Sequence, residues 1–191
     1  MNKRVFITHG WDGNPDEAWL RWLRLELEKN NYKVIAPRMP NTEEPKIEEW
    51  VPFLADLAGK PDEKTYFVGH SIGCQTILRY LETIYPQKAG GAVFVAGWFH
   101  LENLEGPEEE TIIKPWIETP IDLEKVKSAV QKITAIFSDN DPFVPMRDKE
   151  IFQEKLGAEI IIEKNKGHFT EEDSVTELPV VLKKILEIAE K

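Results

Sequence analysis

A single stretch decides the fold: residues Thr65–Gly73, which read TYFVGHSIG. It begins as an apolar run of strand length, and the apolar positions Ile77, Leu78 and Leu81 that follow it recur at helical spacing. A strand that passes through G-x-S-x-G straight into a helix is typical of a nucleophile elbow, a strained turn that raises a serine hydroxyl above a sheet. Ser71 is therefore the candidate nucleophile. The alternative is a glycine-rich turn in which the serine only caps the helix.

On both sides of this stretch, apolar runs of strand length alternate with segments of helical period. Most of the runs have the continuous Val, Ile and Phe character of strands that are covered on both faces. The pattern predicts an α/β fold with a mostly parallel sheet and helices on both faces, ending in a helix over Leu178–Ala189. The other expected strands are Val5–Thr8, Lys33–Ala36, Ala92–Ala96, Ile133–Ser138 and Glu159–Glu163.

One segment breaks this rhythm. Trp98–Leu123 contains Pro107, Pro115 and Pro120 together with a run of glutamates, and prolines at this density end helices. We expect a short insertion over the edge of the sheet, too small for a second domain. At 191 residues the chain is close to one ordinary domain length, so residues 1–191 are predicted to form a single domain.

Composition and charge exclude several classes of partner. The formal net charge is −10, and a surface of that sign repels both phosphate backbones and anionic lipid heads. Nucleic acid and membrane surfaces are therefore not expected as partners. The lone Cys74 and four scattered histidines give neither an intramolecular disulfide nor a metal-ligand spacing, so no metal site is expected. With no apolar signal segment behind Met1, we expect a cytoplasmic protein.

A serine hydroxyl becomes a strong nucleophile only beside a base that is itself oriented by a carboxylate. In this type of fold the acid and the histidine follow the serine along the chain, in that order. The expected strand Ile133–Ser138 ends in a loop with two candidate acids, Asp139 and Asp141, which the residues alone do not separate. His168 follows the last expected strand and is the candidate base. The alternatives are a turn-forming aspartate and a lone surface histidine.

Acyl transfer also needs two preorganised N–H donors for the developing oxyanion. The backbone groups of Ile72, directly after the serine, and of Trp11, in the loop after the first strand, are the candidates. His70 and Cys74 are expected to pack, and His100 to be solvated. Four further aromatic side chains fall in loops expected beside Ser71 and would line an apolar substrate pocket: Trp98, Phe99, Trp116 and Phe143.

At these residues the chain resembles the small serine hydrolase family of the retinoblastoma-binding protein 9 and YdeN-like type, a compact branch of the α/β-hydrolases. The resemblance implies a six-stranded sheet without a large lid, and it assigns the acid to Asp141 beside Ser71 and His168. The segments that carry it are Ile7–Gly10, Gly69–Gly73, Pro115–Trp116, Asp139–Pro145 and Gly167–Phe169.

Together these observations predict a serine hydrolase that needs no cofactor and cleaves carboxyl esters of small, mainly apolar substrates through an acyl-enzyme on Ser71. A small-molecule ester is the expected partner, and nothing in the sequence indicates a protein partner. Because a fold alone does not fix a function, the alternative is a protein-interaction module built on a hydrolase scaffold.

Overall fold

The structure, a computed structural model, describes residues 3–104 and 106–190. Across these residues it contains one six-stranded sheet in which every pairing is parallel, in the order β2-β1-β3-β4-β5-β6. The predicted α/β class and six-stranded sheet are confirmed, and the strand bounds lie within a residue of those expected. The strands are β1 (Arg4–Thr8), β2 (Lys33–Ile35), β3 (Thr65–His70), β4 (Gly91–Val95), β5 (Ile133–Ser138) and β6 (Glu159–Glu163).

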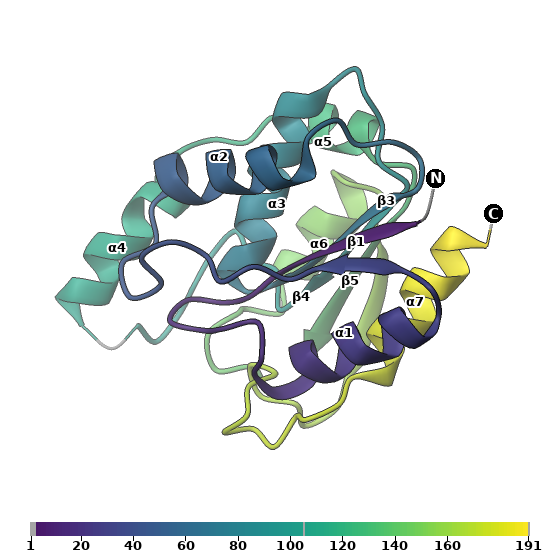
Figure 1. Ribbon diagram of the computed structural model, residues 1–191. Helices are drawn as coiled ribbons and strands as arrows, with labels where there is room; N and C mark the ends of the chain where they lie inside the picture. Colours follow the sequence, from purple (N-terminus) through teal and green to yellow (C-terminus); the bar gives the residue numbers. More distant parts are fainter. Residues whose placement is uncertain (1–2, 105, 191) are drawn as a thin grey trace.

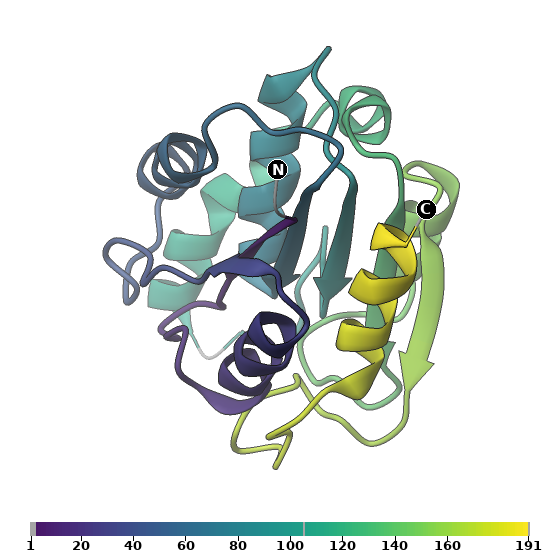
Figure 2. The same ribbon diagram turned by 45° about the vertical axis from the view of Figure 1, so that its right-hand side comes forward.

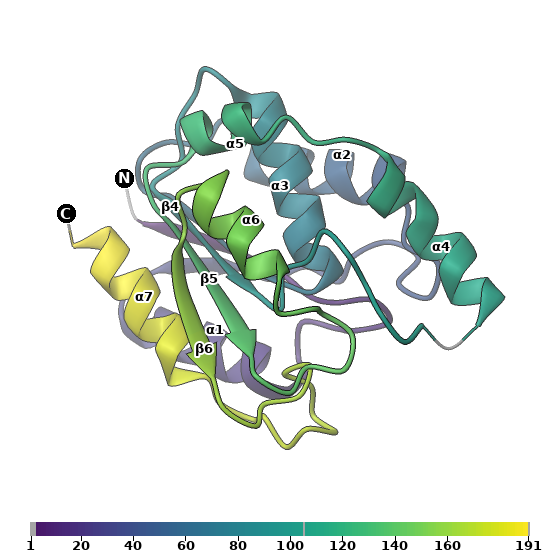
Figure 3. The same cartoon turned by 180° about the vertical axis from the view of Figure 1, so that it is seen from behind.

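Helices cover both faces of this sheet (Figures 1 and 2). On one face lie α1 and α7, and on the other lie α2, α3, α5 and α6, as the view from behind also shows (Figure 3). Every residue of β3, β4 and β5 is buried between the two layers, which explains why these strands read as continuous apolar runs. The helices are α1 (Ala18–Lys29), α2 (Ile47–Ala58), α3 (Ile72–Ile84), α4 (Pro107–Glu118), α5 (Leu123–Ala129), α6 (Asp148–Glu154) and α7 (Pro179–Ala189).

The segment Trp98–Leu123 differs from the expectation drawn from its prolines, because it contains the 12-residue helix α4. Pro107 is the first helical residue, where the missing N–H would have had no intrahelical acceptor. Pro115 lies inside the helix, and its ring removes one hydrogen bond near the carboxyl end. The helix lies beside α2 and α3, beyond the carboxyl ends of the strands (Figure 1).

Among the described residues, no helix is long and apolar enough to cross a membrane.

Candidate active site

The turn between β3 and α3 holds Ser71 in a strained backbone conformation, with φ +51° and ψ −119°. Gly69 and Gly73, on either side of Ser71, allow this turn, because a side chain at either position would collide with neighbouring backbone atoms. A Cβ at Gly69 would stand 2.8 Å from the backbone nitrogen of Cys74, and one at Gly73 would stand 2.3 Å from the carbonyl oxygen of Thr8. Helix α3 can therefore pack closely on β1 and β3, and the serine is raised at the carboxyl edge of the sheet.

Ser71, His168 and Asp141 form a continuous chain of polar contacts. The distance from Ser71 Oγ to His168 Nε2 is 2.9 Å, and the opposite ring nitrogen, Nδ1, lies 2.9 Å from Asp141 Oδ2 and 3.1 Å from Oδ1. Because an ionised carboxylate only accepts hydrogen bonds, Nδ1 carries the proton and Nε2 is free to accept the serine proton. The Asp141 side chain is 2% exposed and that of His168 is 13% exposed, so the surrounding residues shield this contact from solvent.

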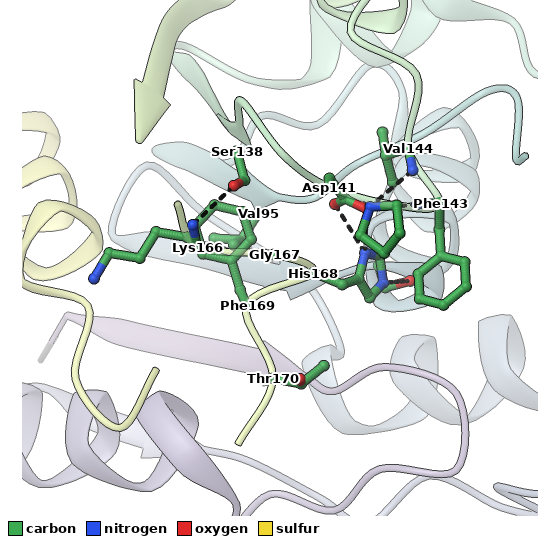
Figure 4. A network of polar contacts seen from close by, with 12 residues as sticks. Val95, Ser138, Asp141, Phe143, Val144, Lys166, Gly167, His168, Phe169 and Thr170 are labelled. Carbon is green, nitrogen blue, oxygen red and sulfur yellow. Dashed lines mark hydrogen bonds and ion pairs between the residues drawn. The ribbon is translucent and has the colours of Figure 1, made fainter. Parts of the chain in front are cut away.

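The loop after β5 holds Asp141 with its carboxylate facing His168 (Figure 4). Backbone N–H groups of Phe143 and Val144 both donate to Asp141 Oδ1, at 2.9 and 3.0 Å. The ring of Phe143 contacts the His168 ring edge-on, with centroids 5.2 Å apart. Asp139, the other candidate acid, instead accepts the N–H of Asn165 and so ties the β5 loop to the loop after β6.

Above Ser71 lies a cavity of about 430 Å³. The two residues expected to supply oxyanion donors, Trp11 and Ile72, line it, as do Trp98 and Phe143 of the expected pocket aromatics. Several other apolar residues of the cavity wall were not predicted from the sequence. For one of them, Ile113, a signal existed: Ile113 and Trp116 stand three positions apart, the spacing of residues on one face of a helix. These additional apolar lining residues are Ala18, Trp19, Leu20, Leu101, Leu104, Ile113 and Phe169.

Two of the expected pocket residues lie elsewhere. Trp116 is a buried residue of α4: its Nε1–H donates to the carbonyl oxygen of Pro45 at 3.0 Å, and its ring packs at 79° against that of Trp50. Phe99 packs on Phe152 with ring centroids 5.1 Å apart, and its backbone N–H donates to the buried carboxylate of Asp148. Neither aromatic belongs to the cavity wall, because each side chain turns into the core and away from the carboxyl edge.

Three further side chains, those of His9, Cys74 and His100, have partners of their own. His9 is held in its neutral form: its Nδ1 lies 2.7 Å from the Gly10 carbonyl oxygen, its Nε2 accepts the Met39 N–H, and burial lowers its pKa. Cys74 is buried with Sγ 3.4 Å from the Val95 carbonyl oxygen, and burial raises the pKa of its thiol. His100, expected to be solvated, has a side chain that is 49% exposed, and its Nδ1 lies 2.6 Å from Asp148 Oδ1.

The charge around the cavity has one sign. Among the described residues that line it, five are carboxylic acids and none is lysine or arginine. The cavity therefore combines an apolar interior with an acidic wall. The five acids are Asp12, Glu17, Glu43, Glu109 and Glu171.

A parallel sheet covered on both faces, with a serine raised on a strained β3–α3 turn and a histidine and an aspartate on later loops, defines the chain as an α/β-hydrolase fold. Residues 5–187 match the model of the family described as serine hydrolase. The chain belongs to this family.

Relatives of known sequence and structure agree with that assignment. The chain is 30% identical to the putative hydrolase YdeN of Bacillus subtilis over 183 residues, which cover 95% of this chain and 93% of YdeN. The crystal structure of YdeN superposes with a TM-score of 0.90 at 26% identity, covering all of both chains. Serine hydrolase RBBP9 of Rattus norvegicus is 27% identical over 85% of this chain and 79% of its own length. Est1E of Butyrivibrio proteoclasticus, solved with ferulic acid bound, shares the fold at 16% identity, with a TM-score of 0.74 over 98% of this chain and 90% of its own.

Proposed function

We propose that this serine hydrolase cleaves carboxyl esters of small, mainly apolar substrates through an acyl-enzyme on Ser71. One observation carries the proposal: the contact chain from Ser71 through His168 to Asp141 opens into a cavity with an apolar interior. The same order of contacts gives a serine its nucleophilicity in acyl transfer. The likeness to Est1E, a protein solved with an aromatic acid bound, is consistent with an apolar acyl or alcohol site of this kind.

In the proposed cycle Ser71 Oγ attacks the ester carbonyl carbon while His168 Nε2 takes the hydroxyl proton. Asp141 keeps the imidazole in the tautomer that can accept this proton and stabilises the imidazolium that forms. The imidazolium then protonates the departing alcohol oxygen, and the acyl group remains on Ser71. A water molecule, deprotonated by the same Nε2, then attacks the acyl carbon; the bond from this carbon to Ser71 Oγ breaks, Oγ regains its proton from the imidazolium, and the carboxylic acid leaves.

Two backbone N–H groups are proposed to stabilise the oxyanion of each tetrahedral intermediate. Ile72 is the first residue of α3, so its N–H has no acceptor within the helix. Trp11 follows β1 in a loop that is fixed by the neighbouring Asp12 N–H, which donates to the Thr42 carbonyl oxygen at 2.9 Å. Both residues line the cavity beside Ser71.

Labelling with a fluorophosphonate tests the proposal, because this reagent reacts selectively with a serine that a neighbouring base activates. We expect one equivalent to attach to Ser71 and to abolish hydrolysis of short and medium-chain neutral esters. Ser71→Ala should remove both labelling and turnover, whereas Cys74→Ala, a change of the buried thiol one helical turn away, should leave labelling at Ser71 intact. Absence of labelling in a folded sample, or ester cleavage that survives Ser71→Ala, would contradict the proposal and favour an interaction module.

A further inference from the structure

His70, the residue before the serine in the G-x-S-x-G motif, lies between the β3–α3 turn that carries Ser71 and the loop that carries His168. It is the last residue of β3 and directly precedes Ser71, and the residue is 8% exposed. Its Nε2 lies 2.8 Å from the backbone carbonyl oxygen of His168. The residue before the candidate nucleophile is thus in direct contact with the backbone of the candidate base, 98 positions along the chain.

The direction of this hydrogen bond follows from the chemistry of the two groups. Burial, together with the neighbouring His168, lowers the pKa of His70 to about 3, so the ring is neutral near pH 7. A carbonyl oxygen can only accept, and a neutral imidazole carries one proton. Nε2 therefore holds the proton and donates to His168, and Nδ1 has none.

The ring of His70 is fixed on several sides. The edge of Trp19 contacts it with centroids 5.8 Å apart and planes at 83°, and the His168 ring lies 5.2 Å away at 45°. On the Nδ1 side, Gly10 approaches so closely that a Cβ there would stand 3.1 Å from this nitrogen. Because the ring has little freedom to move, the position of its Nε2–H is set by β3 and α1.

The loop that His70 holds needs such support. His168 lies between Gly167 and Phe169, whose φ values of +52° and +60° are both in the left-handed region, and the second is unfavourable for a side-chain-bearing residue. The next carbonyl along, that of Phe169, accepts the Nε1–H of Trp19 at 3.0 Å. Two consecutive carbonyl groups of this loop are therefore held by donors from the opposite side of the site.

We propose that His70 is a positioning residue, which fixes the backbone of His168 so that its imidazole stays within hydrogen-bond distance of Ser71. This inference rests on the proposed function, since it assigns His168 the role of base. The link is short: one hydrogen bond and one peptide unit join the base to the nucleophile. A neutral donor suits this place, because a second positive charge beside His168 would disfavour the imidazolium that forms during attack.

Three substitutions at position 70 separate the hydrogen bond from the volume of the ring. His70→Gln can place an amide N–H near the position of Nε2, His70→Asn places its amide nearer that of Nδ1, and His70→Phe keeps a ring without a donor. We expect kcat to fall about 10²-fold in the Phe and Asn variants, the order that a displacement of about 1 Å produces, with KM within about twofold of wild type. His70→Gln should recover most of kcat.

The outcomes distinguish this inference from the proposed function. Circular dichroism and thermal melting select the variants that fold, and the comparison of Gln with Asn stands even where Phe does not fold. If Asn and Phe keep wild-type kcat, or if Gln loses as much as Asn, the hydrogen bond has no positioning role and the inference is wrong. If wild-type protein itself fails to label at Ser71, the proposed function is wrong, whatever the variants do.

Discussion

At the scale of single residues, the two aspartates after β5 have different partners although they stand two positions apart. Asp141 faces the Nδ1 of His168 and accepts two backbone N–H groups, whereas Asp139 accepts the N–H of Asn165. We therefore expect Asp141→Asn to lower kcat by about 10⁴-fold, because an amide can stabilise the wrong imidazole tautomer. Steady-state kinetics on a neutral ester measures the effect.

Asp139→Asn is the matched control, since it makes the same chemical change on the same loop. It keeps an acceptor oxygen for the Asn165 N–H, so we expect kcat within a few-fold of wild type. A larger loss in Asp139→Asn than in Asp141→Asn would transfer the role of orienting acid to Asp139.

This pair also marks a limit of sequence-based prediction. The pattern placed Ser71, His168 and one aspartate at the same edge of the sheet, because the carboxyl ends of parallel strands meet there. It could not separate Asp139 from Asp141, since both lie in one loop and the choice depends on which side chain turns toward the later loop. The same reason applies to His70, whose contact lies 98 residues away.

At the scale of elements, the spacing between β1 and α3 sets the geometry of the site. A Cβ at Gly73 would stand 2.3 and 2.6 Å from the carbonyl oxygens of Thr8 and His9, which are backbone atoms that cannot turn aside. Gly73→Ala should therefore push the end of β1, and with it the loop of Trp11, away from Ser71. We expect a loss of about 3 kcal/mol in the free energy of unfolding and a fall in kcat of about 10²-fold, as when an oxyanion donor is lost.

Gly59→Ala provides the comparison. Gly59 follows α2 with φ +59° and ψ −130°, and a Cβ there would meet nothing within 4 Å, so the only cost is backbone strain of about 2 kcal/mol. Urea titration should show a smaller destabilisation than in Gly73→Ala, and kcat should be unchanged. Equal kcat in wild type and a folded Gly73→Ala variant would show that the β1–α3 spacing does not control the site.

Elements were easier to predict than the direction of their side chains. Runs such as Ile133–Ser138 are buried on both faces, and their composition reports that burial directly. Helix α4 was not predicted, because the number of prolines in the segment was taken to exclude a helix. One of them, Pro107, is the first helical residue, a position at which proline is tolerated. Trp116 and Phe99 were expected in the pocket from their place in the chain, yet each packs inward, a choice that depends on neighbours distant in sequence.

At the scale of the whole molecule, a net charge of −10 and an acidic cavity wall act in the same direction on a charged substrate. Four of the lining acids, Asp12, Glu17, Glu43 and Glu171, form no ion pair among the described residues, so their charges are not cancelled by a neighbouring cation. A neutral ester gains nothing from this field, whereas an ester carrying a carboxylate must approach against it.

Salt provides the test, because the Debye length falls from about 30 Å at 0.01 M to about 8 Å at 0.15 M. Over this range we expect kcat/KM for an anionic ester to rise about threefold or more, while that for its neutral isostere stays constant. Glu43→Lys and Glu28→Lys change the net charge equally, but only Glu43 lines the cavity, whereas Glu28 lies near the far end of α1. Glu43→Lys should therefore raise the low-salt kcat/KM of the anionic ester more than Glu28→Lys does. Equal effects would assign the repulsion to net charge alone, and no salt dependence would show that the acidic wall does not act on the substrate.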